Sequence, residues 1–209
     1  VNQSAQADFA FLLPRFQSPC RNAILRLMLS VRLLGSPQLQ LDDRPVDVPR
    51  RKSRAIIYYL AAHAGPLTRD HLLALFWPDA ERAAAQQTLR TTLHGLRKIL
   101  GASLIVEDDR LAVGQDSDVD VRRFAAVLQP PHSQIPPFGR PTSNVQSLTS
   151  TLQLYRGDFL DGFTLPDSPA FDDWAAAERE RCRRLAVRGL TALSRAHESG
   201  GDYRAALDT

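Results

Sequence analysis

The chain switches between two spacings of hydrophobic residues, one typical of strands and the other of helices. Residues 25–34 alternate loosely between apolar and polar, and Gly35–Pro37 marks a turn before a short predicted strand at Gln38–Leu41. A second turn, at Asp42–Pro45, separates this strand from another at Val46–Val48. The N-terminal part of the chain therefore predicts a small antiparallel sheet.

Helical spacing begins at Arg51 and continues until the Gly65–Pro66 pair. Thr68 is the expected N-cap of a short helix at His71–Phe76. This helix must end there, because Pro78 disfavours helical geometry in the residue before it. The pattern thus predicts two helices in succession.

The next predicted helix, Ala80–Leu100, has the clearest division into two sides. Asp79 is its expected N-cap, and Gly101 is expected to close it as a left-handed residue. At about 100° per residue, one side collects the apolar positions Ala85, Leu89, Leu93, Leu96 and Leu100, which must face a core. The opposite side collects Gln87, Thr91, His94 and Lys98, with Arg90 and Arg97 on its flank.

Beyond this helix the pattern predicts a hairpin and then an all-helical part. Two apolar triplets, Leu104–Val106 and Leu111–Val113, form the hairpin. Residues 129–147 contain five prolines and are expected to form a loop. Three helices are expected: one ending near Leu128, one around Val145–Leu154 and one at Phe171–Ser199, in which Gly189 allows a close neighbour.

These elements define the predicted domains. Residues 1–24 are polar and irregular and are expected to form a flexible leader, followed by a winged-helix domain at 25–116 and a helical domain at 117–209. The fold class is mostly α with a small antiparallel β component. A further helix begins at Asp202 and runs to Thr209, so we expect a fragment of a longer polypeptide.

The distribution of charge divides the chain in the same way. Between Arg21 and Ile105 there are 13 Lys and Arg against 6 Asp and Glu, whereas the rest has 13 against 17. A basic half joined to an acidic half is typical of a polyanion-binding module fused to a protein-binding one. Chance clustering of surface charge is the alternative interpretation.

The long helix is the candidate recognition element. The DNA major groove admits one helix that is apolar on its inner side and offers hydrogen-bond donors and positive charge on its outer side. Arg90, Arg97 and Lys98 suit phosphates or guanine edges, while Gln87, Thr91 and His94 suit adenine, thymine or the backbone. A solvated face normally mixes both signs, but no acidic residue follows Glu81 on this helix.

Two further groups of cations are candidates for contacts with DNA. A basic cluster opens the first helix and consists of Arg50, Arg51, Lys52 and Arg54. The macrodipole disfavours cations there unless an outside anion such as a phosphate is present. Arg110 lies in the hairpin and could enter a minor groove, although neighbouring acids weaken that interpretation. The alternative for the cluster is that it only flanks a strand.

Other functional classes lack a candidate site in the sequence. The two cysteines lie far apart, the five histidines show no metal-ligand spacing, and no phosphate-binding loop or nucleophile motif occurs. No signal peptide or membrane span is expected. We therefore expect a cytoplasmic, non-enzymatic protein without a cofactor, a metal or a small-molecule ligand.

Several segments together resemble the SARP family of bacterial regulators. In the first half they are residues 49–54, 60–61, 68–72, 75–79, 88–90 and 96–98; in the second half they are 118–121 with Phe124, 154–160 and the helix from Trp174. The resemblance covers roughly residues 25–209. Family members join an OmpR-like winged helix to a bacterial transcriptional activation domain.

The resemblance implies a tetratricopeptide-like second domain, binding to promoter repeats in double-stranded DNA, and contact with RNA polymerase. It places the recognition helix at Ala80–Leu100, and a homodimer on repeated half-sites is expected. The proline-rich loop at 129–147 and the alanine-rich stretch Arg82–Gln86 depart from the family pattern. The competing interpretation is a helical scaffold in a larger signalling protein that binds only proteins.

Overall fold

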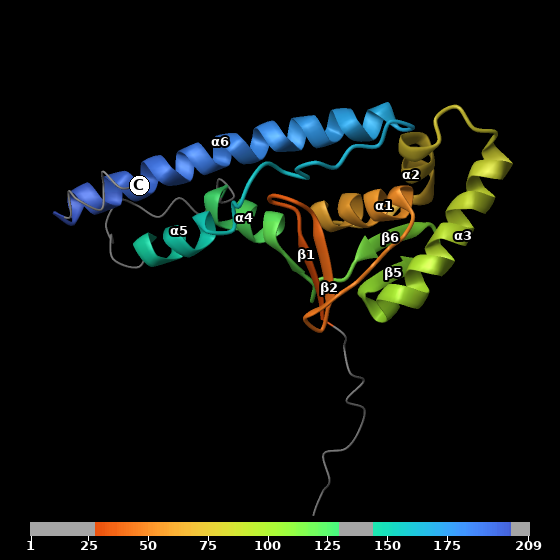
Figure 1. Cartoon of the computed structure of the whole chain (residues 1–209), viewed down its shortest axis with the longest axis horizontal. Helices are drawn as coiled ribbons and strands as arrows, with labels where there is room; N and C mark the ends of the chain where they lie inside the picture. The colour runs from red at the N-terminus through yellow and green to blue at the C-terminus, as the bar shows by residue number, and fades with distance from the viewer. Residues whose placement is uncertain (1–27, 130–143, 202–209) are drawn as a thin grey trace, which may run out of the picture.

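Two small sheets and six α-helices make up the part of the chain that the computed structural model describes, residues 28–129 and 144–201 (Figure 1). The expected leader at 1–24, most of the proline-rich segment and the helix from Asp202 lie outside the described residues. Within the described residues, no helix is long and apolar enough to cross a membrane.

The first sheet has the strand order β3-β2-β1-β7. Its strands are β1 (Leu29–Arg32), β2 (Gln38–Leu41), β3 (Arg44–Pro45) and β7 (Asp118–Val119). The strand at Gln38–Leu41 is confirmed, but the one expected at Val46–Val48 is wrong. Asp42 and Asp43 both take positive φ, 50° and 61°, so the chain reverses tightly and pairs again at Arg44.

The second sheet contains the expected hairpin. Strands β5 (Leu104–Glu107) and β6 (Arg110–Val113) pair antiparallel, and β4 (Leu67–Thr68) joins β6 on its other side. The backbone N–H of Arg69 donates to the carbonyl of Asp109 at 2.9 Å. The hairpin turn is therefore attached to the start of the helix that follows β4.

Three helices and a short 3₁₀ turn complete the first half: α1 (Arg51–Ala62), α2 (Arg69–Phe76), α3 (Arg82–Leu100) and η1 (Gly101–Ser103). Thr68 caps α2 as predicted, accepting a hydrogen bond from the His71 N–H.

The predicted cap of the long helix is wrong. Asp79 lies in a turn, and Glu81 caps α3 by accepting from the N–H groups of Ala83 and Ala84. These donors also lower the pKa of the Glu81 carboxyl.

The second half contains the three helices that the pattern predicts, α4 (Asp120–Leu128), α5 (Asn144–Leu152) and α6 (Pro169–Ser199). In Figure 1, α6 extends across the molecule, from α2 at its N-terminal end to α5 toward its C-terminal end. Gly189 allows the expected close packing, since a Cβ there would lie 2.9 Å from a methyl of Leu152 and 3.0 Å from one of Leu128.

One hydrophobic core runs through both halves. The phenylalanines Phe76, Phe124, Phe159 and Phe171 come from both parts of the chain and are fully buried. Backbone bonds join the halves as well: the N–H of Leu160 donates to the carbonyl of Leu33, and the N–H of Gly35 donates to the carbonyl of Asp158. The two halves are therefore packed as one body.

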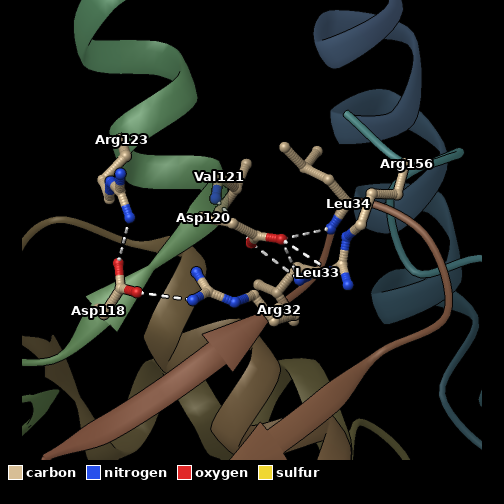
Figure 2. Close-up of polar contacts among 8 residues, drawn as sticks. All are labelled: Arg32, Leu33, Leu34, Asp118, Asp120, Val121, Arg123 and Arg156. Atoms are coloured by element: carbon tan, nitrogen blue, oxygen red, sulfur yellow. Dashed lines mark hydrogen bonds and ion pairs between the residues drawn. The ribbon is translucent and has the colours of Figure 1, made fainter. Parts of the chain in front are cut away.

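Asp120 is a fully buried carboxylate at the junction of the two halves (Figure 2). It accepts from the backbone N–H groups of Leu33 at 2.8 Å, Leu34 at 3.1 Å and Val121 at 2.7 Å. Arg156 lies 3.5 Å away. Burial raises the pKa of the Asp120 carboxyl, while the three N–H groups and the guanidinium oppose that shift.

Replacing this carboxylate should be costly. Asp120→Ala leaves three buried N–H groups without an acceptor and Arg156 without its counter-charge, so we expect a loss of about 3–5 kcal/mol in the free energy of unfolding. Asp118→Ala is the matched control, because Asp118 is partly exposed and pairs with Arg32 and Arg123; it should lose about 1 kcal/mol. Urea unfolding of both variants checks this, and equal losses would contradict the central role of Asp120.

Candidate nucleic-acid interface

The two sides of α3 are placed as its periodicity predicts. Ala85, Leu89, Leu93, Leu96 and Leu100 are all buried. Gln87, Arg90, Thr91, His94, Arg97 and Lys98 are all exposed. Figure 1 shows α3 at one end of the molecule, away from α4 and α5. Within the described part of the chain, the whole polar side of α3 is thus open to a partner.

Arg82, at the start of α3, pairs with Asp70 at 2.9 Å, but the three exposed cations farther along the helix have no partner of opposite charge in the described part of the chain. Neither Arg90, Arg97 nor Lys98 forms an ion pair or a side-chain hydrogen bond with a described residue. The hydroxyl of Thr91 donates to the carbonyl of Gln87 at 3.0 Å, which turns this side chain back onto its own helix. The positive charge of α3 therefore remains available to an outside anion.

Arg110 lies at the start of β6, exposed and opposite Thr68 in the strand register. Three exposed acids, Glu107, Asp108 and Asp109, precede it in the hairpin. Arg69 holds this hairpin from α2 by donating its Nε–H to the carbonyl of Asp108 at 3.1 Å. Arg110 is therefore an exposed cation on a hairpin that also carries three exposed acidic residues.

The cluster at the start of α1 faces the second half of the chain. Arg51 donates its Nε–H to the carbonyl of Thr164 at 2.6 Å, and its guanidinium lies 5.2 Å from the centre of the Phe163 ring. Arg54 also lies over Phe163, at 6.0 Å. Both arginines are thus in contact with the second half.

Lys52 has the most complete set of partners in this cluster. Its ammonium donates to the carbonyl of Phe76 at 3.0 Å, pairs with Asp167 at 2.8 Å and lies 5.1 Å from the Trp77 ring centre. The anion that the start of α1 favours is therefore supplied, at least here, by the protein's own Asp167. That these three residues bind DNA stays a prediction.

A groove borders the polar side of α3 and was missed from the sequence. It has a volume of about 340 Å³ and lies between α3 and the segment that leads into α1. Its lining includes Val48, Pro49 and Arg50 from that segment and Thr91, His94, Gly95, Lys98 and Ile99 from α3. The one signal in the sequence was Gly95, a glycine inside a helical pattern.

Other chemistry has little support in the described residues. They contain no group of three or more His, Cys, Asp or Glu side chains that could hold a metal ion. Cys182 is buried in α6, and burial raises the pKa of its thiol to about 11. This thiol is therefore protonated, and a poor nucleophile, at neutral pH.

Comparison with known proteins bears on both halves. Residues 119–209 match the family model of the bacterial transcriptional activator domain. A solved structure of Mycobacterium tuberculosis EmbR, in complex with a low affinity phosphopeptide, shares the fold over 86% of this chain with a TM-score of 0.63 and 23% sequence identity. The chain spans 48% of the length of that EmbR chain. No curated protein matches the sequence.

These findings agree with the resemblance noted in the sequence. The helices α4, α5 and α6 fall within the matched activator domain, and the helices and hairpin before them form the winged-helix part of the shared fold. The comparisons therefore give the second half a match to the activator domain and give the chain the fold of EmbR.

Proposed function

We propose that the chain binds double-stranded DNA through the polar side of α3 and so directs its activator domain to promoters. The observation that carries this proposal is the set of exposed cations on α3 without acidic partners among the described residues. The buried stripe fixes the helix to the core and leaves its polar side free for a major groove. Gln87, Thr91 and His94 supply the uncharged contacts.

The remaining parts of the proposed function concern the second half. Its activator domain, with a tetratricopeptide-like arrangement of α4, α5 and α6, would contact RNA polymerase. Since promoter repeats present two half-sites, two copies of the chain would bind side by side as a homodimer. Such a regulator acts in the cytoplasm and catalyses no reaction.

Salt dependence tests the proposal against a scaffold that binds only proteins. With about six phosphate contacts, affinity for duplex should fall by ~10³ or more between 50 and 200 mM salt. Fluorescence anisotropy with a labelled fragment of the promoter beside the protein's own gene measures this. The absence of duplex binding at the lower salt concentration would instead favour the scaffold.

Substitutions on α3 test the assignment of the recognition helix. Arg90→Ala and Arg97→Ala should each weaken binding by roughly 1–3 kcal/mol for a bidentate base contact. Arg195→Ala is the control, because Arg195 is exposed on α6, far along the chain from α3. Equal losses of affinity in all three variants would show that α3 is not the recognition helix.

A variant of Lys52 tests whether the cations at the start of α1 serve the fold or bind DNA. Lys52→Ala removes the bonds to the Phe76 carbonyl and to Asp167, so we expect a loss of about 1 kcal/mol in unfolding free energy, because Asp167 is largely exposed. The affinity of the folded protein for duplex should change less than in Arg90→Ala. Calorimetry measures the change in stability, and anisotropy on the same sample measures the affinity for duplex. A larger loss of affinity than in Arg90→Ala would show that Lys52 contacts DNA.

A further inference from the structure

We infer that the groove beside α3 binds one strand of the DNA backbone, which approaches closely at Gly95 in the lining, and that Arg50 and Lys98 on its two sides bind phosphates. This inference rests on the proposed function and adds a second contact surface to it. The groove lies between α3 and the segment from Val48 to Ser53. Four observations lead to it.

Gly95 has no structural reason to be glycine. It is exposed within the 19-residue helix α3, where glycine is, after proline, the least favourable residue. A Cβ added at Gly95 would meet no heavy atom within 4 Å, apart from the helix's own nearby backbone. Its φ is not in the left-handed region either. Because Gly95 has no side chain, a molecule from outside can approach the backbone of α3 closely at this position.

The position of Gly95 around the helix fits a backbone strand. At about 100° per residue, Gly95 lies about 60° from Lys98, on one flank of the polar side. Arg90 and Arg97 lie about 80–100° from Lys98 on the opposite flank. A helix inserted in a major groove has a phosphate backbone on each of its sides. The two arginines therefore face one strand, and the groove at Gly95 faces the other.

The lining of the groove suits a sugar–phosphate chain. Val48, Pro49 and Ile99 give it apolar walls, against which deoxyribose rings can pack. Arg50 and Lys98 supply positive charge from opposite walls, and His94 adds a hydrogen-bonding group. An apolar surface with cations on both sides matches the alternation of sugars and phosphates along a strand.

Arg50 is also free for this role. It occupies the N-cap position of α1, but its side chain makes no capping bond. Unlike Arg51 and Lys52, it forms no ion pair or side-chain hydrogen bond with any residue that the structure describes. Its side chain can therefore be removed without loss of a contact that the fold uses.

The first test removes the cation. The probe is a duplex that the wild-type chain selects from a randomised pool, and affinity is measured by anisotropy over a series of salt concentrations. Arg50→Ala should lower the slope of log affinity against log salt by about one, because one phosphate contact is lost. Arg50→Lys should retain the slope, and Arg188→Ala, at an exposed position on α6, should leave it unchanged. An unchanged slope in Arg50→Ala overturns the inference.

The second test adds a side chain at Gly95, in the lining of the groove. Gly95→Ala should raise the melting temperature by roughly 2–4 °C, because alanine favours the helix. The same variant should bind the duplex roughly tenfold more weakly, and Gly95→Gln, with its longer side chain, more weakly still. Thr191→Ala on an exposed face of α6 is the control for added helix stability and should leave affinity unchanged.

The outcomes separate the inference from the proposed function. If Arg90→Ala weakens binding while both Gly95 variants bind like the wild type, the groove does not seat the backbone, and α3 remains the recognition helix. If the wild-type chain selects no duplex from the pool, the proposed function and this inference fall together. Higher stability with lower affinity in Gly95→Ala supports the inference, because a structural glycine would give the opposite change in stability.

Discussion

The carboxylate of Asp120 determines how the two halves of the chain meet. The strand β1 ends at Arg32, and the next two backbone N–H groups, of Leu33 and Leu34, point to this carboxylate. Because an ionised or polar group buried without partners is costly, acceptor and donors must come together as the core closes. Asp120 opens α4, and Arg156 approaches it from the segment after α5 (Figure 2). Strand, helix and loop are therefore positioned by one group.

That arrangement explains why the basic residues of α1 and those of α3 have different surroundings. Once the second half is held against the first, its loop at Phe163–Asp167 lies over the start of α1 and engages Arg51 and Lys52. Arg90, Arg97 and Lys98 of α3 have no such neighbour among the described residues. Counter-charge from a distant segment thus distinguishes cations that join the two halves from cations available to a partner.

The sequence could predict the parts of the fold that depend on local pattern. The buried stripe of α3, the β5–β6 hairpin and the span of α6 follow from periodicity and from glycine and proline. It could not predict β7, which pairs with β1 across nearly ninety residues. The partners of Lys52 were missed for the same reason, since Asp167 is distant in sequence. The cap at Glu81 was missed because a turn delays the start of α3.

The continuity of α6 has a mechanical consequence. Its 31 residues extend for about 45 Å at 1.5 Å per residue, without an internal proline. One end packs on α2, the helix that precedes α3, and the remainder packs on α4 and α5. Because α6 is a continuous helix packed at both ends, one end cannot tilt without moving the other. A displacement of the end of α6 near Ser199 would therefore be transmitted along the helix to α2 and to α3, the helix proposed to read DNA.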